Sequence, residues 1–175
     1  AAPAGPRRHA IWRATATAEL ASFGGQQSFE TALPLLQSED PLQRWSAVRA
    51  MVVLPLPQRH ARLAPLIGDS NTTVRLEVAR LLAEVPLERV DPAEAARLQA
   101  LFDEYLAIMG RHADVPETQL EMGLFFVARR LWEPAERAYR NAIDMNPQLL
   151  AAYLNMADLY RISGREDAGR EVLLE

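Results

Sequence analysis

The chain has 175 residues, of which 49% are hydrophobic and 24% charged, and these ordinary globular values exclude a disordered, collagen-like or disulfide-stapled protein. Its 19 basic residues, all arginine, and 23 acidic residues give a net charge of −4, which argues against a general polyanion-binding role. Cysteine is absent, so thiol catalysis, thiolate metal sites and covalent haem attachment are excluded, and no apolar run approaches the roughly 20 residues of a membrane span.

The first predicted element is an N-terminal helix within residues 1–27. Its segment RATATAELASFGG is a candidate degenerate copy of the repeat that follows, because Arg13 precedes Arg44 by the 31-residue period of that repeat. The chain begins Ala-Ala-Pro-Ala without a methionine, which predicts a processed product or an excised segment of a longer protein.

A 31-residue repeat organises residues 28–90. The segment LPLLQSEDPLQRWSAVRAMVVLP (33–55) aligns with APLIGDSNTTVRLEVARLLAEVP (64–86). Each copy has a short apolar segment, a polar turn and a longer stretch with apolar residues at helical spacing, so each predicts a pair of helices. Asp40 before a proline predicts the N-cap of the second helix, and Gln43 completes a capping-box pattern.

These helix pairs resemble HEAT or HEAT-like repeats, in which a valine-arginine pair stands near the start of the second helix. Arg75 and, by the repeat offset, Arg44 match the arginine of that family, and Asp69 matches its turn aspartate, whereas Ser38 stands where an aspartate is expected. The resemblance implies two such units and a structural ladder of aspartate-to-arginine contacts between neighbouring copies. We therefore do not expect these arginines to be catalytic.

Residues 91–115 are expected to form a connecting helix. Asp91 before a proline predicts its N-cap. Tyr105 precedes Tyr139 by one period of the repeat that follows, so DPAEAARLQALFDEYLAIMG matches the second helix of a decayed copy of that repeat.

A second repeat begins at residue 116 and has a 34-residue period. In PETQLEMGLFFVARRLWEPAERAYRNAIDMNP, seven residues occupy the positions typical of a tetratricopeptide unit: Met122, Gly123, Phe126, Ala135, Tyr139, Ala142 and Pro147. The next copy starts at Leu150 and stops within its second helix. The segment resembles the tetratricopeptide repeat family, which implies a complete unit at 116–149 and a truncated one at 150–175.

Packing explains the alternation of small and large residues in this pattern. Two helices cross closely only where the contact points are small, so Gly123, Ala135 and Ala142 should admit Phe126 and Tyr139 between the helices. The sequence therefore predicts an all-α protein, a right-handed α-solenoid of stacked antiparallel helix pairs, HEAT-like first and tetratricopeptide second.

No catalytic or metal-binding motif is found in the sequence. His9, His60 and His112 lie far apart along the chain and without metal-ligand spacing. No serine lies in a GxSxG elbow, and no glycine-rich loop follows a phosphate-binding pattern. We expect no enzyme activity, no catalytic residues, no bound metal and no cofactor.

The tetratricopeptide resemblance implies a concave groove lined by the first helix of each unit. The groove positions correspond to Glu117, Leu120, Leu124, Val127 and Ala128, followed by Ala151, Leu154, Asp158, Arg161 and Ile162. Leucine at both residues 120 and 124 departs from the carboxylate-clamp subclass, so C-terminal EEVD-type peptides are not expected as ligands. We expect a protein or peptide partner or a partner helix; the alternative is that a neighbouring helix or subunit covers this apolar surface.

A further resemblance covers most of the chain. The run YLNMADLYRISGREDAGREVL, preceded by the HEAT-like VRLEVARLLAEVP, resembles the haem-free tail of bacterial multihaem c-type cytochromes. The resemblance implies, as an alternative function, a docking tail for a periplasmic cytochrome or another enzyme whose catalytic part lies outside this chain.

Charge and the C-terminal edge give two last expectations. Residues 44–90 carry a net charge of +3 and residues 91–175 carry −6, so we expect no nucleic-acid binding. Val172, Leu173 and Leu174 lie on a helix without a following cap, which predicts that this edge pairs with another copy of the chain or with residues of a longer protein that lie outside this chain.

Overall fold

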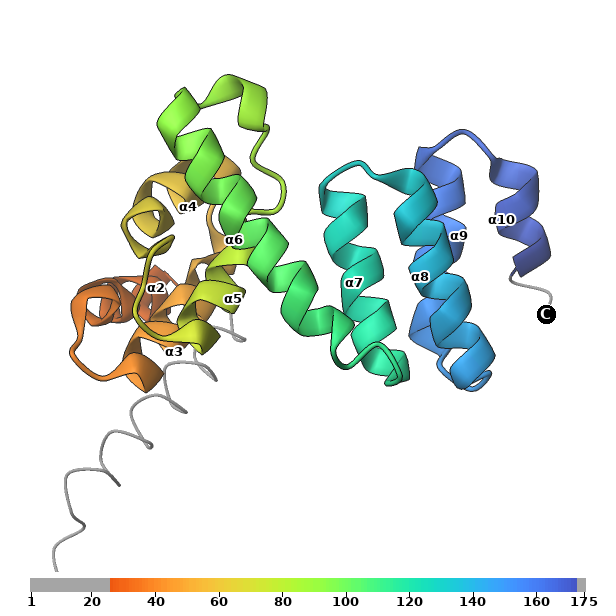
Figure 1. The fold of residues 1–175 in the computed structure, drawn as a ribbon, viewed down its shortest axis with the longest axis horizontal. Coiled ribbons are helices and arrows are strands. Elements are labelled where there is room, and N and C mark those ends of the chain that lie inside the picture. The colour runs from red at the N-terminus through yellow and green to blue at the C-terminus, as the bar shows by residue number, and fades with distance from the viewer. Residues whose placement is uncertain (1–25, 173–175) are drawn as a thin grey trace, which may run out of the picture. The chain divides into compact units, whose positions relative to one another are not determined.

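The computed structural model describes residues 26–172, and every secondary-structure element in this part of the chain is helical (Figure 1). The prediction of an all-α protein is confirmed for these residues. The chain divides into two compact units, residues 1–102 and 103–175. All but the last two residues of the predicted N-terminal element, 1–27, lie outside the described residues.

The first unit is built from short α-helices, several of which end in a 3-10 helix, labelled η. These elements are α2 (Gln26–Ala32), η1 (Leu33–Gln37), α3 (Pro41–Ala50), η2 (Met51–Val53), α4 (Leu56–Leu63), η3 (Ala64–Leu66), α5 (Thr72–Leu82) and η4 (Leu87–Arg89). The 31-residue period is visible in these bounds, because α2 with η1 matches α4 with η3, and α3 matches α5.

The apolar segments at residues 33–37 and 64–66 form the 3-10 ends of α2 and α4, whereas the sequence predicted a separate short helix at each place. Both segments carry a proline near their start, Pro34 and Pro65. Because proline has no N–H to donate to the preceding turn, the α-helix cannot continue unchanged and its last turn tightens.

The second helix of each repeat copy begins at a side-chain N-cap. Asp40 accepts a hydrogen bond from the N–H of Leu42, the second residue of α3, at 2.9 Å, and Asn71 accepts from the N–H groups of the second and third residues of α5 at 3.0 and 3.3 Å. The predicted capping box is not closed. Ser38 Oγ accepts the N–H of Asp40 at 3.2 Å and donates to Gln43 Oε1 at 2.9 Å, so the serine occupies the place of the expected glutamine contact.

An ion pair joins the two repeat copies. Arg44 donates through Nε and Nη2 to the two carboxylate oxygens of Asp69 at 2.7 and 2.8 Å, and both side chains are largely buried. Arg44 Nη1 also donates to the carbonyl of Ser38 at 2.7 Å, and Arg75 makes the equivalent bond to the carbonyl of Asp69 at 2.6 Å. The predicted aspartate-to-arginine contact between neighbouring copies is therefore present, and its hydrogen bonds lower the pKa of Asp69.

Helix α6 (Pro92–Gly110) runs across the division between the two units. Its predicted N-cap is confirmed, because Asp91 Oδ1 accepts the N–H groups of Ala93 and Glu94, each at 3.0 Å. In the second unit, Tyr105 of α6 stacks on Phe125 with ring centroids 4.6 Å apart.

The second unit continues with α7 (Pro116–Ala128), α8 (Trp132–Met145), α9 (Leu150–Ile162) and α10 (Glu166–Val172). Consecutive helices of this unit lie side by side, and α7 also contacts α9 (Figure 1). The 34-residue period is therefore visible in the helix bounds, with α7 and α8 equivalent to α9 and the described part of α10.

The turns that follow α7 and α9 repeat the same backbone geometry. Arg130 has φ of 58°, and Gly164, one repeat period later, has φ of 75°. In each turn the next N–H donates to the carbonyl five residues earlier, at 2.9 Å after Arg130 and 2.8 Å after Gly164. Both are Schellman turns with a left-handed residue at the helix end, which is the local structure expected when one helix hairpin is repeated.

Helices α7 and α8 cross closely at Gly123. A Cβ atom there would lie 2.2, 2.5 and 2.8 Å from three ring carbons of Tyr139, which is only 1% exposed. Ala135 and Ala142 are fully buried on α8, and Phe126 packs half-buried against the core of the unit. The predicted contact of Gly123 with the Tyr139 ring is confirmed, and Ala135 and Phe126 belong to the same packed region.

Candidate functional site

Two of the predicted groove leucines are exposed, and one is not. Leu124 on α7 is 41% exposed and Leu154 on α9 is 51% exposed. Leu120 and Val127 are half-buried and pack against the core cluster of the second unit. Among the predicted leucine and valine groove positions of α7, Leu124 is therefore exposed, whereas Leu120 and Val127 are half-buried.

Helix α9 presents a longer apolar stripe than sequence reasoning identified. Leu150 is 66% exposed and Ile162 is 46% exposed. With Leu154 they are spaced by four and eight residues, which places all three on one side of the helix. Leu150 was missed as a surface residue, although its spacing from Leu154 was a usable signal. We call the exposed side chains Leu124, Leu150, Leu154 and Ile162 the α7–α9 face.

Charged groove residues lie beside this face. Glu117, Asp158 and Arg161 are exposed, and Asp158 Oδ1 accepts from both Nε and Nη2 of Arg161 at 3.1 Å. Burial raises the pKa of Tyr139, and the charges of Glu121 on α7 and Asp158 on α9 raise it further.

A polar cluster, which the sequence analysis did not predict, joins α8 to α9 and to the start of α10. Tyr160 Oη donates to Glu136 Oε1 at 2.9 Å, and Arg140 Nη2 lies 2.6 Å from the same oxygen and 3.2 Å from Tyr160 Oη. Arg165 Nη2 lies 2.8 Å from Glu136 Oε2, and its guanidinium stands 4.7 Å from the centroid of the Tyr160 ring. A usable signal was the hydroxyl of Tyr160, which occupies the repeat position where the first unit has Phe126.

Electrostatics hold this cluster in one protonation state at neutral pH. Burial by itself raises the pKa of Glu136, but the hydrogen bonds from Tyr160 and Arg165 and the charges of Arg140 and Arg165 outweigh it, so the pKa lies below its ordinary value. Burial and the hydrogen bond to Glu136 raise the pKa of Tyr160. Glu136 is therefore a carboxylate and Tyr160 a neutral phenol near pH 7.

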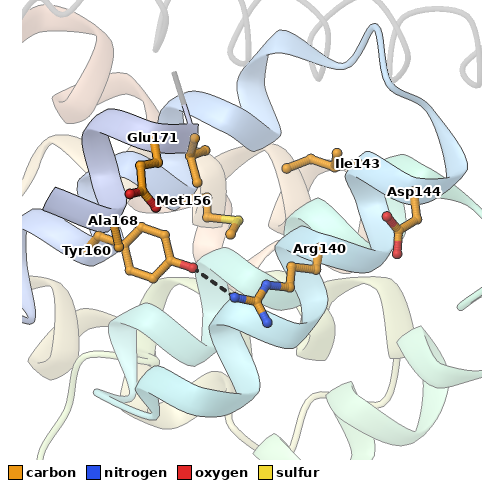
Figure 2. A pocket seen from close by; sticks show the side chains of 8 residues that line it. Arg140, Ile143, Asp144, Met156, Tyr160, Ala168 and Glu171 are labelled. Atoms are coloured by element: carbon orange, nitrogen blue, oxygen red, sulfur yellow. Dashed lines mark hydrogen bonds between the residues drawn. The ribbon is translucent and has the colours of Figure 1, made fainter. Parts of the chain in front are cut away.

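A pocket of about 360 Å³ opens beside this cluster, between α8, α9 and α10 (Figure 2). It is lined by Arg140, Ile143, Asp144, Met156, Tyr160, Ala168, Glu171 and Val172. Figure 2 shows Arg140 bonded to Tyr160 at the edge of the pocket, with Asp144 and Glu171 on separate helices. The volume is at the lower end of the range for small-ligand sites, and the lining mixes apolar side chains with charges of both signs.

The predicted self-association edge is only partly described. Val172 is buried, and it belongs to the core cluster of the second unit together with Met156 and Tyr160. Leu173 and Leu174 lie outside the described residues. Val172 therefore does not offer an exposed apolar surface to a second copy.

The first unit has a shallower hollow of about 300 Å³ between the first turns of α3 and α5. It is lined by Pro41, Leu42, Trp45, Asn71 and Thr73. Because the side chains of Asp40 and Asn71 already accept hydrogen bonds from the N–H groups of these helix ends, the hollow does not present a ready anion site.

Histidines do not gather in the described part of the chain. His60 Nε2 lies 3.1 Å from Glu94 Oε1, whereas His112 is exposed and His9 lies outside the described residues. Among residues 26–172, no three histidine, aspartate or glutamate side chains are arranged to hold a metal ion. Within the same range, no helix combines the length and apolar character that crossing a membrane requires.

Comparison of the chain with protein-family models, with curated proteins and with solved structures finds no match. A functional assignment therefore depends on the residues and geometry described above.

Proposed function

We propose that this chain is a non-catalytic interaction scaffold, an α-solenoid whose α7–α9 face binds a protein or peptide partner. The observation that supports this proposal is the set of four large apolar side chains exposed on two helices that contact each other. Helix pairs that recur with the two repeat periods, with equivalent caps and turns, support the solenoid.

Burial of this face on a partner yields a free energy large enough to contribute to specific binding. Full burial of a leucine or isoleucine side chain contributes about 1.5–3 kcal/mol, so covering four roughly half-exposed ones contributes about 4 kcal/mol in total. Exposed apolar side chains grouped in this way mark interaction surfaces more often than isolated ones do.

The polar cluster around Glu136 also supports a scaffold. Glu136 is held as a carboxylate by three donors, and Tyr160 is held as a neutral phenol. Such a cluster fixes α8, α9 and the start of α10 relative to one another, which is a structural use of titratable groups.

The experiment that tests the proposal is affinity capture of partners from a lysate of the source organism. The test variant combines Leu124→Glu with Leu154→Glu, and it leaves Leu120 in place because that half-buried side chain packs against the core cluster. The matched control is Met145→Glu, since Met145 is 45% exposed at the end of α8 and does not belong to the α7–α9 face.

We expect a partner that is retained by the wild type and by Met145→Glu and is lost by the double variant. Far-UV circular dichroism and melting temperature would show that all three proteins are equally folded. The proposal would be contradicted if the double variant captured the same partners as the wild type. It would also be contradicted if the wild type captured no partner at all.

A further inference from the structure

We propose that the partner of the α7–α9 face is a basic amphipathic helix. This inference rests on the proposed function and specifies the chemistry of the partner. The observations that carry it are the charge that surrounds the face, the geometry of the apolar stripe and the saturated backbone of the helices that present it.

Acidic side chains border the apolar face on both helices. Glu117 and Glu121 are exposed on α7, and Glu121 precedes Leu124 by one helical turn. Asp158 is exposed on α9, one turn after Leu154. Asp158 is paired with Arg161, whereas neither Glu117 nor Glu121 has an ion-pair partner among the described residues. A cationic partner would therefore form ion pairs with Glu117 and Glu121 that are not made among the described residues.

The two contacting helices each contribute an acidic side chain beside the apolar face. Glu121 comes from α7 and Asp158 from α9, and both side chains are exposed. Leu124 and Leu154 each lie one turn from one of these carboxylates, which places apolar and acidic contacts within reach of a single ligand segment.

The stripe on α9 has the length and spacing of a helical ligand site. Leu150, Leu154 and Ile162 span roughly 18 Å at about 1.5 Å of rise per residue. A partner helix of about three turns would present its own apolar residues at spacings of three and four residues along that length, as helices that dock on grooves do.

Backbone hydrogen bonding favours a helix over a β-strand that adds to an edge. Strand addition needs unpaired N–H and C=O groups on the receptor, as a sheet edge supplies them. Inside α7 and α9 the backbone groups are paired within each helix, so the face offers side chains only. The backbone N–H and C=O groups of a ligand helix are already hydrogen-bonded within that helix, so it needs only side-chain contacts from the surface. Long-range charge acts in the same direction, because residues 91–175 carry a net charge of −6 and would speed association with a cation.

The test uses two synthetic amphipathic helical peptides with the same leucine face, one with lysine and one with glutamate at every polar position. Binding to the full chain is measured by fluorescence anisotropy of the labelled peptides at low and at physiological salt. We expect the lysine peptide to bind at least about tenfold more tightly than the glutamate peptide, with a ratio that shrinks as salt rises.

Two variants separate a seated helix from general attraction to an acidic protein. Leu124→Glu with Leu154→Glu adds two negative charges, so general attraction would strengthen, whereas a seated helix should bind about tenfold more weakly. Glu117→Gln with Glu121→Gln keeps the apolar seat and should weaken the lysine peptide about threefold or more, with a smaller salt dependence. Met145→Glu serves again as the exposed control and should leave the affinity unchanged.

Each contrary outcome is distinct. Equal binding of the two peptides would overturn the basic partner and leave the α7–α9 face as an uncharged docking surface, so the proposed function would stand. Undiminished binding of the lysine peptide to Leu124→Glu with Leu154→Glu would show general attraction and would also overturn the inference. Absence of binding by both peptides would overturn the helical partner. The proposed function would be overturned only if the capture experiment failed as well.

Discussion

The close crossing of α7 and α8 gives a sharp test of the packing described above. In Gly123→Ala, the new Cβ atom would overlap three carbons of the Tyr139 ring at 2.2, 2.5 and 2.8 Å. The ring is almost fully buried, so it cannot swing into solvent to relieve the contact. The two helices must separate, or the ring must leave its rotamer.

The expected cost follows from two opposing contributions. Overpacking a close-packed core costs about 1–3 kcal/mol, and three simultaneous overlaps place this case at the upper end. Alanine gains about 1 kcal/mol over glycine in the interior of a helix. Gly123→Ala should therefore lower the free energy of unfolding by about 2 kcal/mol. In a Tyr139→Ala background the overlap is gone, so the same substitution should gain about 1 kcal/mol, which makes the coupling energy about 3 kcal/mol.

Urea unfolding of the full chain, followed by far-UV circular dichroism, measures these differences. Gly110→Ala is the matched control, because Gly110 is the last residue of α6 and a Cβ atom there would meet no atom within 4 Å. That control should lose no stability. An unchanged unfolding midpoint for Gly123→Ala, or a coupling energy near zero, would refute the reasoning.

Two further predictions concern the backbone and the ion pair. Arg130→Gly should raise the free energy of unfolding by about 0.5–1 kcal/mol, because a left-handed φ costs a non-glycine residue about 1–2 kcal/mol and the flexibility of unfolded glycine offsets part of this gain; a drop in melting temperature would contradict it. Asp69→Asn should cost about 3 kcal/mol at neutral pH, since largely buried Arg44 loses its charged partner. The pKa of Asp69 in the folded state is lowered, so the pair stabilises the fold fully above the ordinary carboxylate pKa of about 3.9 and less as pH falls through the folded value. Chemical unfolding across that range should show the difference between wild type and variant shrinking in acid, and a constant difference would count against the pair.

Local patterns in the sequence were enough to predict much of the fold. The predicted features were the 31- and 34-residue periods, the N-caps at Asp40 and Asp91, and the small residue Gly123. Each of them depends on groups within a few helical turns of one another. Helix periodicity and capping are decided at that range, so spacing and residue type suffice to predict them. The contact between Arg44 and Asp69 was also predicted, because the repeat places the same two positions next to each other in every copy.

Packing between helices decided the rest, and the candidate site depends on it. Leu120 and Leu124 occupy adjacent turns of α7 and look alike in sequence, yet Leu120 is half-buried against the core cluster of the second unit whereas Leu124 is 41% exposed. The same holds for Glu136, whose three donors come from two other segments and its own helix. The spacing of residues in a sequence predicts which of them share a helix face. Whether that face is exposed to solvent depends on the helices that pack beside it. Fold class and repeat register were therefore determined by the sequence alone, whereas the extent of the α7–α9 face and the ion pairs around Glu136 were set by tertiary contacts.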